Sequence, residues 1–464
     1  VVWTQRANFF DLHTVCPHRD ERLGWSCDAQ VYVGNATYNA DVSAFYRKWL
    51  RELMESQRPS GAFPGFAPTP FHRGFDFGTA WTDAGVICPW TIWQAYGDTR
   101  VIEDCWQPMT RFIDWRISAS RNDLGVQHGT PWGDWLAQGA KTPIPFIDSI
   151  YFAISTRMMA EMAEAIGRDD QAARYRDQLQ RTKQAFRAKY LTDDGEVTAA
   201  TQTAYALALF ADLVPAEMRE ATGQKLAAKI AASGNHMTTG FLGTRPLLPA
   251  LSASGQNDLA VFLLQSHEFP SWGYEVDQGA TSIWERWDSY TKEDAFGRHN
   301  AAMNSFSHYA FGAVCEWMFR TLAGIQSDGP GFHKVTIHPH PPAVGSNSMH
   351  KPIDWVRASY KSIHGTIRSD WRIEGERFHL SVTIPTNTTA TGLLPTDHAS
   401  QITVSGDTVR NHPHVELLRH ENGSAVLSVA SGDYEFVAHG GVPKAAIALK
   451  TSEPKDRSVN TEGN

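Results

Sequence analysis

The 464-residue chain has little cysteine, no excess of basic residues and no long apolar run. Its five cysteines are odd in number and lack the spacing of metal ligands, so we expect buried free thiols and neither a disulfide framework nor a metal site. A formal net charge of -8 leaves no basic footprint for nucleic acid or an anionic membrane. No window supplies the roughly 20 apolar residues that a membrane span needs. We therefore expect no nucleic acid partner, no membrane partner and no cofactor.

The first residues of the sequence contain neither an initiator methionine nor the pattern of a signal peptide. The chain begins at Val1 in the middle of a pattern, so we expect a fragment or a processed product. Its compartment and its oligomeric state stay open. Tryptophan, in contrast, is abundant, with 16 residues. Flat indole rings suit the apolar faces of sugars, although core packing explains most of them equally well.

The densest cluster of charge lies in residues 16–30, CPHRDERLGWSCDAQ. Pro17 and Gly24 disfavour a helix over most of this segment. From Asp28 onward the pattern is helical, with Asp28 placed as the N-cap. One interpretation is a solvated charged turn, because ion pairs at loops are common. The other is a sugar site, because a solvated charged turn rarely contains Trp and Gly.

Helical spacing dominates the chain as far as about residue 323. The apolar spacing predicts about twelve helices, several of which are joined by short turns that imply antiparallel neighbours. This pattern suits an α/α toroid, although periodicity alone does not separate a toroid from another large helical domain. The expected helices cover residues 28–38, 41–53, 79–96, 99–119, 148–166, 169–189, 201–212, 216–232, 241–253, 256–266, 281–286 and 301–323.

After Gly324 the helical spacing gives way to alternation of apolar and polar residues. Residues 377–385 and 427–436 alternate with period two around turn residues, which predicts half-buried antiparallel strands and a β-sandwich. We place the domain boundary near residue 327, which gives a helical domain over 1–327 and a β-domain over 328–445. The polar tail, residues 446–464, is expected to be disordered.

A second cluster, residues 278–288 (QGATSIWERWD), places two indoles around Glu285 and Arg286. One interpretation is a buried Glu285–Arg286 pair under tryptophan packing. The other is a catalytic carboxylate. Hydrolysis of a glycosidic bond needs a protonated carboxylic acid at the leaving oxygen and an ionised carboxylate that activates water on the opposite face. The two pKa values must be pushed apart, and in an inverting enzyme the carboxyl groups stand about 6.5–9.5 Å apart.

Residues 15–30 resemble a signature of the glycoside hydrolase family 78 α-L-rhamnosidases and match 12 of its 16 positions. Residues 279–288 resemble a second segment of that family at all but one position. The resemblance runs through nearly the whole chain and implies that the catalytic domain is an (α/α)6 barrel followed by the β-domain. It also implies an inverting hydrolase that releases a terminal α-L-rhamnose, or a closely related sugar, from glycosides or polysaccharides.

Carried over position by position, the resemblance implies that Glu21 is the general acid and Glu285 the general base. The two are 264 positions apart, so only the fold could bring them together. Each implied tryptophan contact is equally consistent with plain core packing, His308 with a satisfied helix histidine, and Asp134 with an Asx-turn. The residues expected to bind the sugar are Arg19, Trp25, Asp28, Trp81, Asp83, Trp132, Asp134, Trp135, Trp284 and His308.

Two departures from the family pattern concern the first motif. Val15 stands in place of an aspartate that hydrogen-bonds sugar hydroxyls in the family, and Cys27 stands in place of a glycine. Valine cannot accept a hydrogen bond, and a hydroxyl left unpaired there would cost on the order of 1–3 kcal/mol of binding. Three functions therefore stay open: an α-L-rhamnosidase, a hydrolase of the same fold that takes another sugar, and a carbohydrate-binding protein without turnover.

Overall fold

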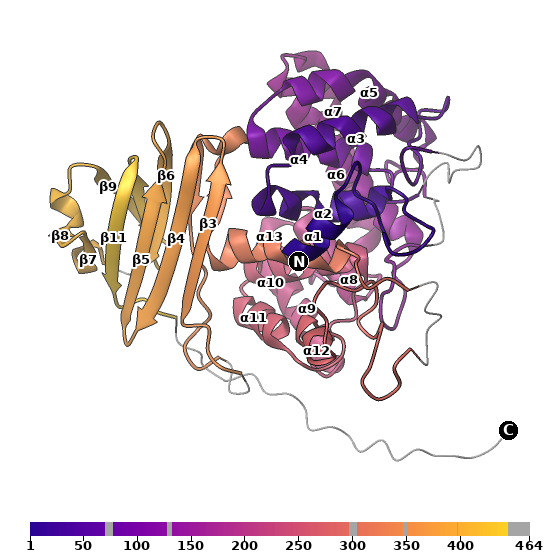
Figure 1. Cartoon of the computed structure of the whole chain (residues 1–464). Helices are drawn as coiled ribbons and strands as arrows, with labels where there is room; N and C mark the ends of the chain where they lie inside the picture. The colour runs from indigo at the N-terminus through magenta and orange to yellow at the C-terminus, as the bar shows by residue number, and fades with distance from the viewer. Residues whose placement is uncertain (70–77, 128–131, 297–303, 347–349, 397, 444–464) are drawn as a thin grey trace.

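The computed structural model describes residues 1–464 except 70–77, 128–131, 297–303, 347–349, 397 and 444–464. A helical domain is followed by a β-domain that lies beside it (Figure 1). The expected tail over 446–464 lies outside the described residues. Within the described part of the chain, no helix is both long enough and apolar enough to cross a membrane.

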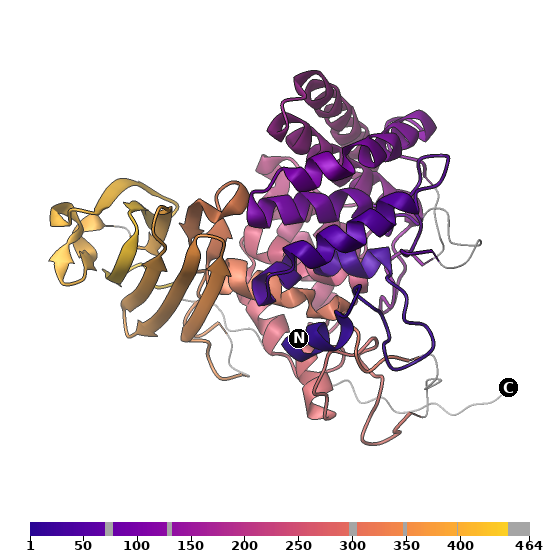
Figure 2. The same ribbon diagram turned by 45° about the horizontal axis from the view of Figure 1, so that its top comes forward.

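Six inner helical elements form a closed ring, because each contacts the next and the sixth contacts the first. Five outer helices follow inner ones along the chain, so the domain is an (α/α)6 barrel, seen from a second side in Figure 2. Two short helices, α1 (Val2–Asn8) and α12 (Trp272–Asp277), complete the domain. The inner elements are α2 (Ser26–Asn39), α4 (Ala84–Tyr96), α6 (Ile144–Ala165), α8 (Gln202–Phe210), α10 (Phe241–Ala253), and the 3-10 turn Ala310–Ala313 that continues into α13 (Val314–Trp317) and a π turn over Met318–Leu322. The outer helices are α3 (Ser43–Glu55), α5 (Arg100–Ala119), α7 (Asp169–Tyr190), α9 (Arg219–Ala232) and α11 (Asn257–Gln265).

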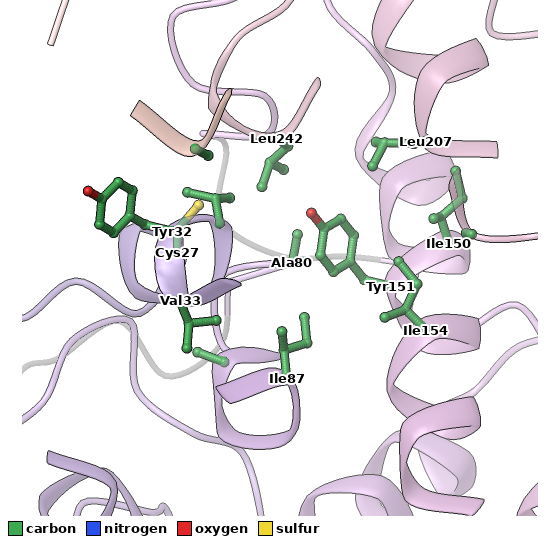
Figure 3. Packing of buried hydrophobic residues seen from close by; sticks show 14 of the residues in the cluster. Cys27, Tyr32, Val33, Ala80, Ile87, Ile150, Tyr151, Ile154, Leu207 and Leu242 are labelled. Carbon is green, nitrogen blue, oxygen red and sulfur yellow. The ribbon is translucent and has the colours of Figure 1, made fainter. Parts of the chain in front are cut away.

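The division into inner and outer helices follows from their sequences. The inner helices α4 and α8 carry no charged residue and are buried over most of their length. The outer helix α7 is rich in charge and buries one narrow apolar stripe. Figure 3 shows the core that the inner helices build, with Val33, Ile87, Tyr151, Leu207 and Leu242 each coming from a different one.

One expected helix is wrong, a second begins later than expected, and one expected cap is misplaced. Residues 281–286 are irregular, and no helical element begins before Ala310 in the described part of 301–323. The reason is that these two segments pair with each other: the backbone N–H of Glu285 donates to Ser305 O (2.9 Å), and that of His308 donates to Ile283 O (2.9 Å). Helix α2 begins at Ser26, so Asp28 lies in its first turn and is not the N-cap.

The β-domain consists of two packed sheets. The five-stranded sheet has the order β1-β2-β6-β10-β9, and the six-stranded sheet has the order β3-β4-β5-β11-β7-β8. All strand pairs are antiparallel except β2 with β6, which are parallel. The strands are β1 (Ile325–Ser327), β2 (Lys334–Ile337), β3 (Trp355–Ser362), β4 (Gly365–Glu374), β5 (Arg377–Ile384), β6 (Thr389–Pro395), β7 (Ile402–Val404), β8 (Asp407–Thr408), β9 (Val415–Glu421), β10 (Ser424–Val429) and β11 (Gly432–His439).

Each domain has its own hydrophobic core. The buried residues of the helical core end at Leu322, and those of the β-domain core begin at Ala323. The sheet is fastened to this junction, because Trp371 Nε1 donates to Leu322 O (2.7 Å) and Ser369 Oγ donates to Ala323 O (2.6 Å). We propose that the domains divide here, a few residues before the expected position near 327.

Candidate active site

A cavity of about 350 Å³ opens at one end of the helical ring. Several of the residues that line it lie near the N-termini of inner elements: Trp25 and Asp28 at α2, Trp81 shortly before α4, Phe241 at α10, and His308 shortly before the 3-10 turn. Helix N-termini point partial positive charge and free N–H groups at such a space. The full lining is Val15, Arg19, Glu21, Trp25, Asp28, Trp81, Trp132, Trp135, Phe241, Glu285, Arg286 and His308.

The first motif forms a tight loop that holds Glu21 at the cavity. Both Nε (3.0 Å) and Nη2 of Arg19 donate to Glu21 Oε2, and Trp25 Nε1 donates to Glu21 Oε1 (2.6 Å). Cys16 and Arg22, on either side of this pair, have positive φ angles of 54° and 49°. Such angles are uncommon in residues other than glycine and cluster at functional sites. The loop therefore fixes the direction of the Glu21 carboxylate.

Glu285, which is 264 positions after Glu21 in the sequence, lies near the guanidinium group of the same Arg19. Its side chain is buried (5% exposed), and Arg19 Nη2 lies 3.9 Å from Glu285 Oε2. Trp135 Nε1 donates to Glu285 Oε1 (3.4 Å), whereas Oε2 has no hydrogen bond to any residue that the structure describes. Burial raises the pKa of Glu285, while Arg19 and the Trp135 hydrogen bond oppose that rise. The two glutamates thus lie on either side of a single positive charge.

Asp28 and His308 form a second polar pair in the cavity. Both are buried, and His308 Nε2 lies 3.2 Å from Asp28 Oδ1. Burial, helped by the charge of Arg19, lowers the pKa of His308 to about 3, so the imidazole is neutral near pH 7. Burial also raises the pKa of Asp28 well above its usual value. The contact at Asp28 Oδ1 does not have the geometry of a hydrogen bond, and His308 Nδ1 has no hydrogen bond among the described residues.

An aromatic wall faces these polar groups. The ring of Trp25 meets Trp81 and Trp132 edge to face, with centroid distances of 5.5 and 5.4 Å. Trp81 and Trp132 lie 4.5 Å apart, and the indole N–H of the buried Trp81 has no acceptor among the described residues. Five residues at this cavity (Arg19, Asp28, Trp81, Glu285 and His308) therefore each have a buried side-chain atom that makes no hydrogen bond within the described part of the chain. Such groups are costly unless a ligand or water pairs with them.

Asp83 is an expected sugar-binding residue that the structure places outside the cavity. It is fully buried and receives hydrogen bonds from Arg116 and from Ser155 Oγ (2.6 Å). Arg116 also donates to Asp148 Oδ1 (2.7 Å), which completes a buried ion network. Burial raises the pKa of Asp83 to about 6, against the opposing charge of Arg116. Asp83 thus holds the turn that contains Trp81 in place, and it does not line the cavity.

Asp134, another expected sugar-binding residue, has both carboxylate oxygens hydrogen-bonded within the protein. Its two carboxylate oxygens accept from the backbone N–H groups of Gly240 (2.8 Å), Leu242 (2.8 Å) and Gly243 (3.0 Å), and from Thr203 Oγ1 (2.5 Å). It is therefore a cap for the N-terminus of α10, supplied from a distant loop, and is not the local Asx-turn considered from sequence. It holds the neighbouring Trp135 at the cavity.

The cavity differs from the expected set in three further residues. Trp284 is buried against Phe306, with ring centroids 5.5 Å apart, and does not line the cavity. Phe241 does line it and packs on His308 (5.0 Å), although no motif surrounds it in the sequence. Arg286 lines it as well, and its position beside Glu285 is the signal that could have placed it there.

Val15 and Cys27 differ in where they lie. Val15 is buried (2% exposed) and lines the cavity, so the carboxylate expected at this position from the family pattern is missing from the cavity wall. Cys27 is fully buried on α2 within the barrel core, as Figure 3 shows, and is not part of the cavity lining. Within the described residues, no group of three His, Cys, Asp or Glu side chains could hold a metal ion.

Comparison with known families assigns both domains. Residues 1–322 match the family described as the bacterial α-L-rhamnosidase six-hairpin glycosidase domain. The chain belongs to this family. Residues 324–408 match the bacterial α-L-rhamnosidase C-terminal domain, so the resemblance noted in the two motifs is confirmed over most of the chain.

Individual relatives agree with the family. The chain is 38% identical over 436 residues to an α-L-rhamnosidase of Streptomyces avermitilis and 35% identical over 447 residues to one of Formosa agariphila. These alignments cover 94% of this chain but only 40% and 47% of those proteins, so the chain spans less than half the length of these curated relatives.

Solved structures of the family share the fold. The structure of the Streptomyces avermitilis α-L-rhamnosidase complexed with L-rhamnose superposes with a TM-score of 0.86 over 94% of this chain and 40% of that one. The structure from Dictyoglumus thermophilum, at 26% identity, gives 0.83 over 94% of this chain and 48% of that one. The barrel followed by a β-domain is therefore the arrangement that the family has.

Proposed function

We propose that the cavity binds a terminal α-L-rhamnose unit, or a closely related sugar, and that the domain hydrolyses the bond joining it to a glycoside or polysaccharide. The observation that carries this proposal is the pairing of Glu21 and Glu285 around Arg19 inside a cavity with unpaired buried polar atoms. An aromatic wall opposite those atoms suits the apolar face and the methyl group of a 6-deoxy sugar. Membership of a family named for α-L-rhamnosidases supports this choice of sugar.

In the proposed reaction Glu21 is the general acid and Glu285 the general base. Glu21 gives its proton to the glycosidic oxygen as the bond to C1 breaks, and Glu285 takes a proton from the water that attacks C1 from the opposite face. The products are the free sugar with inverted configuration and the alcohol of the leaving group. Asp28, His308 and the Trp81 indole N–H would bind the sugar hydroxyls, because each has an unpaired buried polar atom facing the cavity.

The two carboxylates of the cavity share the charge of Arg19. Burial raises the pKa of Glu285, and the negative charge of Glu21 adds to that rise. An acid–base pair that starts with one proton is what an inverting hydrolysis requires, since one carboxyl group must give a proton while the other receives one.

Two variants separate the proposed roles. Glu21→Gln should lower kcat/KM for a 4-nitrophenyl α-L-rhamnoside by about 10²–10⁴-fold, and by much less for a 2,4-dinitrophenyl rhamnoside, whose leaving group needs little protonation. Glu285→Gln should be slow on both and partly rescued by azide, which replaces the activated water. Glu161→Gln, an exchange on the outer face of α6 that leaves the cavity intact, is the matched control. Equal losses on both substrates in Glu21→Gln would contradict the assignment of the acid.

The stereochemical outcome is tested separately. Proton NMR during hydrolysis should show the β-anomer of the sugar first, followed by mutarotation, if the reaction inverts C1. First appearance of the α-anomer would contradict inversion and would favour a covalent intermediate on one of the two glutamates.

Val15 favours a second candidate, a hydrolase for a sugar that lacks the hydroxyl group facing this position. Because Val15 is buried at the cavity, it offers that hydroxyl no acceptor. If the natural sugar is L-rhamnose, Val15→Asp should raise kcat/KM for an aryl α-L-rhamnoside by about tenfold, which corresponds to 1.4 kcal/mol. Unchanged or lower activity would favour the other sugar, and a panel of aryl glycosides assayed with the unmodified protein would identify it.

A further inference from the structure

A second cleft of about 380 Å³ lies outside the catalytic cavity, between the segment around α12 and the loop 288–295 (α12 is labelled in Figure 1). We call it the α12 cleft. One wall is aromatic, formed by Phe269 and Tyr274, and the other is polar, with Asp288 and Lys292 among its residues. None of its lining residues lines the catalytic cavity.

The aromatic wall is not part of the protein core. Phe269 is 37% exposed and meets Tyr274 edge to face, with ring centroids 5.4 Å apart. Neither residue belongs to the hydrophobic core of the helical domain, although Trp272 between them packs against it. An exposed and a half-buried aromatic ring side by side at a cleft are the kind of surface on which the apolar face of a sugar ring packs.

The polar wall is held in place by the protein itself. The loop closes on itself through reciprocal backbone hydrogen bonds between Thr291 and Ala295 (3.1 and 2.8 Å). Gln278 Oε1 accepts from the backbone N–H of Lys292 (2.8 Å) and joins the loop to the end of α12. The cleft is therefore formed by contacts within the protein before any ligand binds, and the ammonium group of Lys292 and the side-chain N–H₂ group of Gln278 are donors along its polar wall.

The α12 cleft adjoins the catalytic cavity along the chain. Arg286 lines the cavity and Asp288 lines the cleft, and two residues span at most about 7 Å. A terminal sugar held at Glu285 would therefore leave the next rings of an oligosaccharide within reach of the cleft. Because the terminal sugar fills the catalytic cavity, what meets the cleft is the part of the substrate beyond the scissile bond.

We propose that the α12 cleft is a subsite for sugar rings on the leaving-group side, so that the preferred substrate is a rhamnose-terminated oligosaccharide or polysaccharide and not a glycoside of a single small ring. This inference rests on the proposed function. Stacking on Tyr274 and Phe269 supplies binding energy, and the polar wall orients the rings through their hydroxyl groups.

The kinetic test compares two substrates. One is a 4-nitrophenyl α-L-rhamnoside, and the other is a four-ring oligosaccharide that ends in α-L-rhamnose. Tyr274→Ala and Phe269→Ala should each raise KM for the oligosaccharide about tenfold. Neither exchange should change kcat or KM for the aryl rhamnoside. Tyr274→Phe should retain most of the effect of the ring. Phe210→Ala removes another partly exposed aromatic ring, at a distant position in the sequence, and should change KM for neither substrate.

A binding measurement keeps this test independent of catalysis. Calorimetric titration with the same oligosaccharide lacking its rhamnose should show binding to the unmodified protein and at least tenfold weaker binding to Tyr274→Ala. If the unmodified protein hydrolyses neither substrate but binds this oligosaccharide through Tyr274, the cleft is confirmed and the proposed function fails. Absence of binding, or equal losses on both substrates in the kinetic test, would overturn the proposed subsite.

Discussion

The pKa of Glu285 is subject to opposing effects of its surroundings. Burial favours its protonated form, whereas Arg19 at 3.9 Å and the hydrogen bond from Trp135 favour the carboxylate. A general base must be ionised before it can accept a proton from water. Activity should therefore fall as the pH drops through the raised pKa of Glu285. The position of this acidic limb of the pH profile depends on the groups that surround Glu285.

Replacing Trp135 by Phe tests this dependence with one hydrogen bond. The exchange keeps an aromatic ring at the cavity but removes the N–H that stabilises the carboxylate, so the pKa of Glu285 should rise further. The acidic limb of kcat/KM should move upward by about 0.5–1 pH unit, since one hydrogen bond contributes about 1 kcal/mol. The measurement is kcat/KM for an aryl α-L-rhamnoside between pH 3.5 and 7.5.

The matched control is Trp284→Phe, an exchange beside Glu285 in the sequence but outside the cavity. Its acidic limb should stay where it is in the unmodified protein. A limb that does not move in Trp135→Phe, or that moves to lower pH, would contradict the assignment of Glu285 as the base.

Sequence reasoning found the residues that carry a motif and misjudged those whose partners are remote. Glu21, Arg19 and Asp28 all reach the cavity, and their motif resembled a known family. Asp83 and Asp134 looked alike in the sequence, as acids in loops that lead into helices. Their hydrogen-bond donors lie 33 to 109 positions further on, so a local pattern contains no sign that both carboxylates are bound by groups within the protein.

At the scale of elements, the cavity depends on how α10 begins. Its first three backbone N–H groups have no partner within the helix, and Asp134 accepts from two of them. Because Asp134 immediately precedes Trp135, the same contact holds the loop that donates to Glu285. The Asp134 cap therefore stabilises the start of α10 and also positions the Trp135 side chain that hydrogen-bonds to Glu285, the proposed base.

Removing this cap should destabilise the helical domain. Asp134→Ala leaves three buried backbone donors without an acceptor, so we expect the free energy of unfolding to fall by about 2–4 kcal/mol. Asp134→Asn keeps an oxygen acceptor and should cost less than Asp134→Ala. Urea unfolding followed by tryptophan fluorescence measures both. Asp114→Ala, which breaks an exposed ion pair with Arg174, should change stability by no more than about 0.5 kcal/mol; a similar loss in the two alanine variants would contradict the capping role.

Helical spacing predicted most helices of the barrel because their packing stripes repeat along the chain. It failed at 281–286 and in the described residues just before Ala310, which belong to two segments that pair with each other across some 20 positions. A window of one helix length contains no information about such pairing. For the same reason, period-two alternation indicated the strands but not the sheet order, in which β2 pairs in parallel with β6.

For the whole molecule, the two domains are joined by contacts that bury polar groups at their junction. Besides the bonds from Trp371 and Ser369, Tyr38 OH donates to Ile325 O (3.1 Å), and the Tyr38 ring packs between Phe319 and Tyr360. A residue of α2, which also carries Asp28 into the cavity, thus contacts the β-domain core. We infer that the β-domain supports the end of the barrel at which the chain leaves it.

The pH dependence of folding follows from histidines that the fold holds neutral. His13 is fully buried: Nε2 lies 3.2 Å from Trp25 O, and its ring meets Trp49 edge to face at 4.2 Å. Burial lowers the pKa of His13 to about 3, against 6.5 in an unfolded chain. Between these two values the unfolded chain binds a proton that the folded protein does not, so this contribution to stability is present above pH 6.5 and is lost as the pH falls towards 3.

Comparing the protein with His13→Gln isolates this contribution, because the buried carboxylates are common to both and cancel. The stability advantage of the unmodified protein should shrink by about 2 kcal/mol between pH 7 and pH 5, at roughly 1.4 kcal/mol per pH unit below 6.5. Urea unfolding at several pH values measures it. Tyr46→Phe alters the same packing without a group that titrates in this range, so its difference from the unmodified protein should not depend on pH. A constant difference for His13→Gln as well would mean that His13 takes up its proton in the folded state, against the burial that the structure gives it.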